Sequence, residues 1–342
     1  MSEFNIDTDI RRARTLPSRF YTEQRYFDMA REKIFSRCWH FVGRRDDLQD
    51  LEPIFLLPDL MDEPILISKA GGSLFCLSNV CTHRGKILVE NRTEGNLIRC
   101  GYHGRRFSLD GKFLSMPEFE GVENFPGESD DLHQYALADR GGFLFVSCDP
   151  VADFDDFVGD ARETLLKIKA NDLALTGSKE YEVAAHWALY CENYLEGFHI
   201  PYVHKGLNEL VDYGTYTTET FRYSSLQTGF DDNGNIAGQY LFVFPNLMLN
   251  FYPWGISVNV VEPISMSRSR IRYLTFVSDE RKFGTGAGAD LHRVEFEDEA
   301  IVESVQKGIR SRFYDRGRYS PTREQGTHHF HRLISEFISD GK

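Results

Sequence analysis

The spacing of apolar residues divides the first half of the chain into a short helical segment and a region of strands. Between residues 18 and 40, Phe27, Ala30, Ile34 and Cys38 recur at the spacing of one helix face. They predict an amphipathic helix that packs on the rest of the fold. From residue 41 to about 150, short runs of β-forming residues are separated by turns with Gly, Asp and Asn. This second pattern predicts an all-β domain.

The remaining residues carry both helical and strand-like patterns. Residues 153–170 have helical spacing, and another helix is predicted to begin near Leu189. Aromatic and β-branched runs within 238–277 indicate antiparallel strands, and helices are predicted at 293–313 and around 321–338. The predicted fold class is α+β. It comprises an N-terminal helical segment (1–40) packed on the fold, an all-β domain (41–150), and a domain with an antiparallel sheet flanked by helices (151–342).

Composition narrows the class of protein further. The 342 residues are 41% hydrophobic and 27% charged, the balance of a soluble globular protein. The chain has no apolar run as long as a membrane span, and its acidic N-terminus lacks the features of a secretory signal. We therefore expect a cytoplasmic protein that is not membrane-bound. The net charge of −13 argues against nucleic-acid binding, which usually leaves a basic footprint.

Two short motifs, Cys81-Thr-His83 and Cys100-Gly-Tyr-His103, carry the clearest chemical signal. In a Rieske [2Fe–2S] cluster, two cysteines bind one iron and two histidines bind the other. A structural zinc site also uses two cysteines and two histidines, but zinc fingers pair Cys with Cys and His with His. Here each motif has one of each, so the all-β domain is predicted to bind a Rieske cluster that relays single electrons. The other four cysteines are expected to be small buried apolar residues.

A second group of polar residues lies inside an aromatic stretch near residue 190. On a continuous helix Glu192, Glu196 and His199 would project from one face, since they are spaced i, i+4 and i+7. His204 lies five residues after His199, so an uninterrupted helix would misalign the two rings. Pro201 is placed to break that helix.

Two histidines and one carboxylate from elsewhere would form the facial triad of a mononuclear iron(II) oxygenase. The best third ligand is Asp298, which lies near the edge of a predicted buried stripe formed by Ile301, Val305 and Ile309. The neighbouring Glu295, Glu297 and Glu299 could be confused with it. The competing interpretation is that all four carboxylates are solvated charges on a helix.

Both motifs, the aromatic stretch 244–254 and the tail after Gly317 together resemble Rieske non-heme iron oxygenase α-subunits, of the aromatic-ring-hydroxylating dioxygenase superfamily. The tail and the aromatic stretch look closest to the choline monooxygenase and glycine-betaine demethylase branch. The resemblance implies that His199, His204 and Asp298 bind the mononuclear iron. It also implies a catalytic role for Asn193 and Glu196, with Glu196 serving electron transfer between subunits of a homotrimer.

The resemblance also implies a function. The chain would be the terminal component of an oxygenase that uses O₂ to hydroxylate a small quaternary ammonium or N-methyl compound. Electrons would come ultimately from NAD(P)H through a separate reductase of flavin or ferredoxin type, because the sequence shows no flavin or nicotinamide site of its own. The alternatives are an aromatic-ring-hydroxylating dioxygenase and, from another class, a Rieske electron-transfer protein without oxygenase activity.

Several other residues invite a functional interpretation, but a structural one is favoured. We expect His328, His329 and His331 to alternate in exposure on a terminal helix, and His133 and His186 to be structural. The aromatic residues around the second motif are expected to be core residues more often than walls of a binding site. These are Tyr190, Tyr194, Phe198, Tyr202, Phe251, Tyr252 and Trp254.

Overall fold

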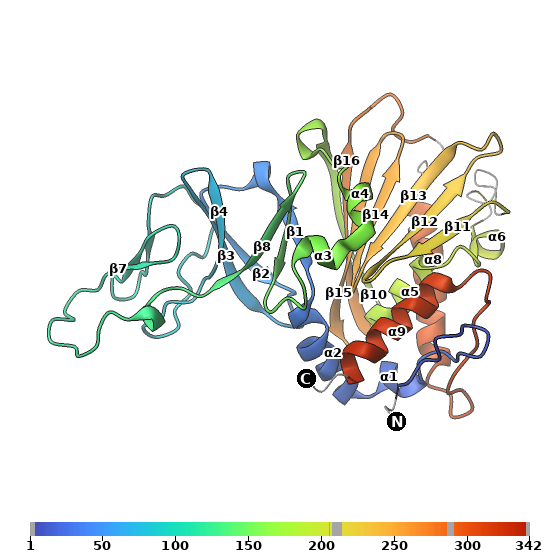
Figure 1. Ribbon diagram of the computed structural model, residues 1–342, viewed down its shortest axis with the longest axis horizontal. Helices are drawn as coiled ribbons and strands as arrows, with labels where there is room; N and C mark the ends of the chain where they lie inside the picture. Colours follow the sequence, from blue (N-terminus) through green and yellow to red (C-terminus); the bar gives the residue numbers. More distant parts are fainter. Residues whose placement is uncertain (1–3, 205, 207–213, 286–290, 340–342) are drawn as a thin grey trace. The chain divides into compact units, whose positions relative to one another are not determined.

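The computed structural model describes residues 4–204, 206, 214–285 and 291–339 (Figure 1). The chain forms two compact units. One unit is Trp39–Pro150, and the other joins Met1–Cys38 to Val151–Lys342. In the described part of the chain, no helix is both long enough and apolar enough to cross a membrane.

The Trp39–Pro150 unit is built from two antiparallel sheets. The larger sheet has the strand order β1-β9-β8-β4-β3-β2, and the smaller one has the order β5-β6-β7. The strands are β1 (His40–Arg44), β2 (Leu51–Leu56), β3 (Glu63–Ala70), β4 (Ser73–Ser78), β5 (Ile98–Arg99), β6 (Arg106–Phe107), β7 (Phe113–Ser115), β8 (Gln134–Arg140) and β9 (Phe143–Ser147). This unit has no α-helix among its assigned elements, so the prediction of an all-β region is confirmed.

The larger unit is organised around one seven-stranded antiparallel sheet of order β10-β16-β15-β14-β13-β12-β11. Its strands are β10 (Ala174–Val183), β11 (Thr217–Thr220), β12 (Ser224–Phe230), β13 (Ile236–Val243), β14 (Leu247–Tyr252), β15 (Gly255–Ser265) and β16 (Arg268–Val277). The strands predicted within 238–277 are therefore present. Together with the helices below, they confirm the α+β fold class.

The central strands present two chemically different faces. Leu241, Leu249 and Val258 are paired across β13, β14 and β15, and all three are buried. Because successive side chains of a strand point to opposite faces, the residues between them form the other face. There Tyr240 pairs with Asn250, and Asn250 pairs with Ser257. One side of the sheet is thus apolar core, and the other side offers hydroxyl and amide groups.

Helices pack around this sheet (Figure 1). α5 contacts both α8 and β15, while α9 contacts α2 and β11. The described helices are α1 (Ser18–Thr22), α2 (Gln24–Lys33), α3 (Phe154–Val158), α4 (Arg162–Leu165), α5 (Trp187–Tyr194), α6 (Ile200–Val203), α8 (Leu291–Gly308) and α9 (Gln325–Ser339), with short 3₁₀ turns at Phe35–Arg37, Arg45–Asp47, Glu128–Asp130, Gly159–Ala161 and Ala170–Asp172. The predicted N-terminal helix is interrupted at Glu23, but its four apolar positions are buried as expected.

Two expectations about the C-terminal helices are wrong. His328 and His331 are both buried, because α9 turns its histidine-bearing face into the protein. His331 Nδ1 lies 2.6 Å from the hydroxyl of Tyr319, and its Nε2 lies 3.0 Å from Glu192. The buried positions on α8 are Val302 and Gln306, whereas Ile301 and Val305 are exposed; Ile309, directly after the helix, is also buried. Two of the three residues of the predicted stripe are therefore exposed, and only Ile309 is buried as predicted.

Candidate metal centres

The two cysteine–histidine loops have the same backbone design. In the first loop the Cys81 N–H donates to the Lys86 carbonyl, and the Gly85 N–H donates back to the Cys81 carbonyl. The second loop repeats both bonds, from the N–H of Cys100 to Arg105 and from the N–H of Gly104 to Cys100. Gly85 and Gly104 have φ values of +70° and +75°, which side-chain-bearing residues rarely adopt. The glycines that follow the histidines are thus required by the turns.

The loops bring their cysteines and histidines together in two layers. Cys81 and Cys100 are buried, and their thiols are close enough for each to affect the pKa of the other. The rings of His83 and His103 lie nearer the surface, with centroids 4.8 Å apart. The backbone N–H of Tyr102 points at the sulfur of Cys100 from 3.4 Å, as expected beside a thiolate.

A partly buried ion pair holds the two loops in place. Arg105, only 2% exposed, donates to the Asp130 carboxylate at 2.6 Å. The hydroxyl of Thr82, in the other loop, donates to the carbonyl of Asp130 at 2.9 Å. One residue therefore ties both loops together. In this setting His103 Nδ1 is buried without a hydrogen-bond partner among the described residues, which fits a nitrogen that binds iron.

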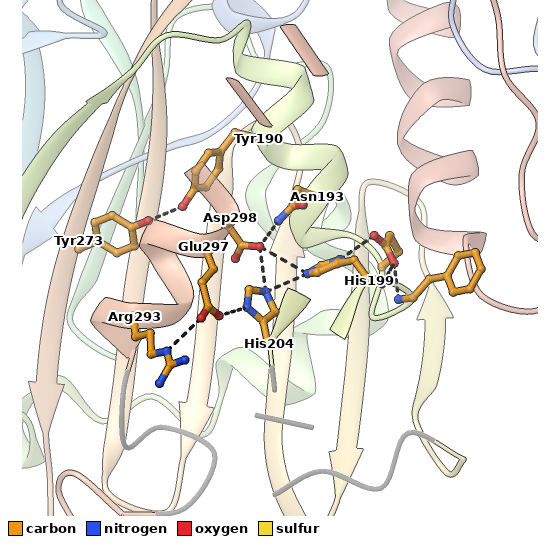
Figure 2. Close-up of polar contacts among 10 residues, drawn as sticks. Tyr190, Asn193, His199, His204, Tyr273, Arg293, Glu297 and Asp298 are labelled. Carbon is orange, nitrogen blue, oxygen red and sulfur yellow. Dashed lines mark hydrogen bonds and ion pairs between the residues drawn. The ribbon is translucent and has the colours of Figure 1, made fainter. Parts of the chain in front are cut away.

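A second centre lies in the larger unit, where three potential ligand atoms converge (Figure 2). Nε2 of His199 lies 3.1 Å from Nε2 of His204. Oδ1 of Asp298 is 2.9 Å from the His204 nitrogen and 3.4 Å from the His199 nitrogen. For metal–ligand bonds of about 2.1 Å, ligand atoms at right angles are about 3.0 Å apart. The triangle therefore has the size of one face of an octahedral metal site.

Carboxylates behind the histidines orient both rings. His199 Nδ1 lies 2.7 Å from Oε1 of Glu196, and His204 Nδ1 lies 2.8 Å from Oε2 of Glu297. A proton on each Nδ1 would be donated to the carboxylate, which leaves the Nε2 lone pairs directed at the centre. Arg293 donates to Glu297 at 3.0 Å and extends this arrangement outward (Figure 2).

The electrostatics of the centre favour positive charge. Burial alone would raise the pKa of Asp298, but hydrogen bonds from His199 and His204 lower it to about 2. Burial would lower the pKa of His199, but its bonds to Asp298 and Glu196 raise it to about 10. In both cases the interaction between histidine and carboxylate outweighs the effect of desolvation on the pKa. A metal cation would supply the charge that these groups stabilise.

The helix break that aligns the histidines occurs earlier than predicted. α5 ends at Tyr194, and α6 begins only at Ile200, so the turn over residues 195–199 separates Glu192 from His199. Pro201 lies in the first turn of α6, where a proline is tolerated. The prediction that Glu192, Glu196 and His199 share one helix face is therefore wrong. Glu192 instead accepts a hydrogen bond from the Tyr21 hydroxyl and lies 3.0 Å from Nε2 of His331.

Asp298 reaches the centre from α8, on the side of the helix that carries Val302 and Gln306. Its Oδ1 also accepts a 2.7 Å hydrogen bond from the side-chain amide of Asn193 on α5. The structure thus brings four predicted site residues together: Asn193, His199, His204 and Asp298 (Figure 2). Glu196 joins them through His199.

A pocket opens at this centre, and tyrosines form much of its wall. It encloses about 850 Å³ of empty space, including the open solvent at its mouth. Five tyrosines line it: Tyr190, Tyr194, Tyr216, Tyr240 and Tyr252. The sheet contributes Met248, Asn250, Ser257 and Asn259 from its polar face. By contrast, Phe198 and Tyr202 are exposed, and Trp254 is buried core.

Comparison with known families agrees with both centres. Residues 38–126 match the Rieske [2Fe-2S] domain, and residues 214–340 match the catalytic domain of the ring-hydroxylating α-subunit. The chain belongs to the Rieske non-heme iron oxygenases. It is an oxidoreductase, and the cofactors of this family are a Rieske [2Fe-2S] cluster and a mononuclear iron.

Curated relatives are similar along almost the whole chain. Chloroplastic choline monooxygenase of Arabidopsis thaliana is 29% identical over 364 residues, covering 98% of this chain and 85% of the relative. The carnitine monooxygenase oxygenase subunit of Escherichia coli K12 is 28% identical, covering 98% of this chain and 97% of the relative.

Solved structures show the same fold. The quaternary ammonium Rieske monooxygenase CntA, in complex with its substrate L-carnitine, has a TM-score of 0.79 and 28% identity, covering 97% of both chains. Naphthalene 1,2-dioxygenase from Rhodococcus, bound to indole, has a TM-score of 0.76 at 17% identity, covering 96% of this chain and 95% of that one. The second likeness shows the fold alone.

Sequence reasoning missed several residues of the site. Tyr216 and Tyr240 line the pocket, but they lie outside the motif around residue 190. Glu297 was considered only as a competitor of Asp298, whereas it contacts the far nitrogen of His204. Adjacent acidic residues point in different directions around a helix, so only the three-dimensional structure distinguishes their roles.

Proposed function

We propose that this oxygenase hydroxylates a small quaternary ammonium or N-methyl compound. The observation that carries the proposal is the tyrosine-lined, acidic pocket beside the His199–His204–Asp298 triangle. The relatives that share the whole chain length are named for choline and carnitine. A cation over an aromatic face gains about 0.5–2 kcal/mol, so several tyrosines together give useful affinity.

The tyrosine rings meet at angles suited to enclosing a rounded cationic head. Tyr240 and Tyr252 are nearly perpendicular, at 79°, with centroids 6.0 Å apart. Tyr216 stacks beside Tyr240 at a centroid distance of 6.4 Å. Two perpendicular faces can contact different methyl groups of one ammonium ion, which supports an alkylammonium ligand over a flat aromatic ring.

We further propose the ligands of each centre. Cys81 and Cys100 bind one iron of the cluster, and His83 and His103 bind the other. His199, His204 and Asp298 bind the mononuclear iron, with Asn193 holding the aspartate in position through its 2.7 Å hydrogen bond. The cluster would belong to the Trp39–Pro150 unit, and the catalytic domain would comprise the larger unit.

The bound irons would supply single-electron relay and O₂ activation. The overall change converts R–H, O₂, two electrons and two protons into R–OH and water. Hydroxylation of an N-methyl carbon gives a hemiaminal, which releases formaldehyde and leaves a demethylated amine. Hydroxylation of an alcohol carbon gives an aldehyde hydrate instead. Because the fate of the product depends on which carbon faces the triangle, product analysis identifies the substrate's orientation.

The electrons must come from another protein, and we propose a reductase of flavin or ferredoxin type fed by NAD(P)H. We also propose a homotrimer in which Glu196 links His199 to His103 of a neighbouring subunit. A solved structure of CntA, 25% identical to this chain, has given insight into inter-subunit electron transfer in that protein. The His199 half of this link is supported by two contacts: Oε1 of Glu196 lies 2.7 Å from His199 Nδ1, and Oε2 accepts a hydrogen bond from the His199 backbone N–H.

The Glu196 role is tested by Glu196→Gln. The amide keeps the size of the side chain but removes its charge, so iron content should survive while electron transfer slows. Single-turnover reoxidation of the reduced cluster, with substrate and O₂ present, measures the transfer directly. Reoxidation at the wild-type rate, or full activity in a monomer, would exclude the bridging role.

The substrate class is tested by O₂ consumption with a surrogate reductase. Choline, carnitine, betaines and aromatic acids are compared at equal concentration, with formaldehyde and aldehyde measured as products. We expect coupled O₂ uptake with at least one quaternary ammonium compound. Coupled turnover of aromatic compounds alone would instead favour a ring-hydroxylating dioxygenase.

A further inference from the structure

The pocket beside the histidine–carboxylate triangle carries an excess of negative groups. Its lining includes three carboxylates, those of Glu196, Glu295 and Asp298. None of the described residues that line it is a lysine or an arginine. A divalent metal at the triangle would offset two of the three negative charges. One negative charge then remains to be balanced when all three carboxylates are ionised.

Of the three pocket carboxylates, Glu295 is the one that remains available to interact with a ligand. Glu196 is bonded to His199, and Asp298 is bonded to Asn193 and His204. Glu295 makes no hydrogen bond or ion pair with any residue in the described ranges, although it is half-buried in the pocket wall. It lies on α8 one turn before Asp298, so both side chains reach the same cavity.

The surroundings of Glu295 do not supply a counter-charge inside the pocket. Burial raises its pKa to about 8, and Lys179, an exposed residue of β10, opposes this only in part. The nearby carboxylates of Asp298 and Glu299 add to the increase. A cation in the pocket would stabilise the ionised form of such a buried carboxylate, because it compensates for the lost hydration. Tyr190 and Tyr252, whose pKa values Glu295 helps to raise, line the same cavity.

We propose that Glu295 is the counter-charge for the substrate's ammonium group, and that the pocket therefore selects monocations over zwitterions. This inference rests on the proposed quaternary ammonium substrate and refines it. An amino alcohol brings one positive charge and a hydroxyl that the tyrosine and asparagine groups can bind. A betaine brings the same head with a carboxylate, which would face Glu295 and Asp298 without a lysine or arginine among the described lining residues.

The test compares three ligands that share one shape. Choline is the monocation, glycine betaine replaces its hydroxymethyl group by a carboxylate, and 3,3-dimethylbutanol replaces its nitrogen by carbon. Binding to the reduced holoenzyme is measured by anaerobic calorimetry above pH 8, where Glu295 is ionised. Turnover of choline and betaine is measured in parallel, which separates KM from kcat.

The variants are Glu295→Gln and, as a matched control, Glu299→Gln. Glu299 lies one helical turn further along α8 and is not among the residues that line the pocket. Iron content is determined for each protein, so that loss of metal is not mistaken for loss of substrate binding. We expect wild type to bind choline more tightly than betaine. Loss of the charge in Glu295→Gln should weaken choline binding about 10–100-fold and leave 3,3-dimethylbutanol unchanged.

The outcomes separate this inference from the proposed function. Preferred binding of betaine by wild type, or equal choline affinity in wild type and Glu295→Gln, would overturn the role of Glu295 while leaving an ammonium oxygenase. An equal loss of choline affinity in Glu299→Gln would also overturn it. If no quaternary ammonium compound binds or stimulates O₂ uptake, the proposed function itself fails.

Discussion

The contact between Glu297 and His204 makes a quantitative prediction about metal affinity. His204 is 2% exposed, so water cannot readily replace the carboxylate that lies 2.8 Å from its Nδ1. The hydrogen bond with His204 is also the main cause that lowers the pKa of Glu297, so the carboxylate is ionised. An ionised acceptor behind a ligating imidazole fixes its tautomer and increases its basicity. Removing the charge should weaken the metal site without removing any ligand.

The perturbation is Glu297→Gln, and the expected loss of affinity is about 10–100-fold, the usual effect of such outer partners. This corresponds to about 1.4–2.8 kcal/mol. Glutamine keeps a neutral acceptor, so its loss of metal affinity should be about 10-fold. Glu297→Ala leaves Nδ1 of His204 without this acceptor, so its loss should be about 100-fold. Arg293 loses its charged partner in both variants, but it is exposed and can be solvated.

The assay is an anaerobic titration of protein that retains its cluster but lacks mononuclear iron. Cobalt(II) serves as the probe, because its visible absorption reports ligand number and geometry. Glu299→Gln is the control, since no bond between that carboxylate and either histidine is found in the described residues. Affinities within twofold of wild type for both Glu297 variants would refute the reasoning.

Three further outcomes are expected. Cys100→Ser should abolish the visible absorption of the cluster. His199→Ala should keep this absorption but lose the mononuclear iron. Loss of the cluster absorption in His199→Ala would contradict the assignment of two separate centres. Gly326→Ala should lower the free energy of unfolding by about 1–3 kcal/mol, because the added Cβ would collide with the Leu195 carbonyl oxygen; calorimetric melting that matches wild type would count against this packing. Burial lowers the pKa of His186 to about 3 in the folded protein. Below about pH 6.5 the unfolded state therefore binds a proton on this histidine that the folded state does not bind. Stability should therefore fall with decreasing pH, and His186→Asn should remove about 1.4 kcal/mol per pH unit of that slope between pH 6 and 4 in urea titrations; an unchanged slope would show that this histidine is not the group responsible.

The cluster loops illustrate what the sequence alone determines. Each loop places its Cys and His two or three residues apart, and its turn depends on a local glycine, so the chemistry and the geometry occupy one short segment. The alternation of apolar residues likewise predicts β13 and β15, because strand periodicity is a local property. The pairing of the two loops is less local, yet their matching flanks already indicate it.

Tertiary structure alone decided how the second centre is assembled. Asp298 lies 94 residues after His204, and the spacing of its helix did not show which side faces inward. Packing against α5 selects the side with Val302 and Gln306, and this selection separates the roles of Glu295, Glu297 and Asp298. Sequence periodicity defines the faces of a helix, but burial depends on what the rest of the chain brings against each face. For the same reason the tyrosine wall of the pocket, drawn from strands and helices far apart in sequence, is visible only in the folded protein.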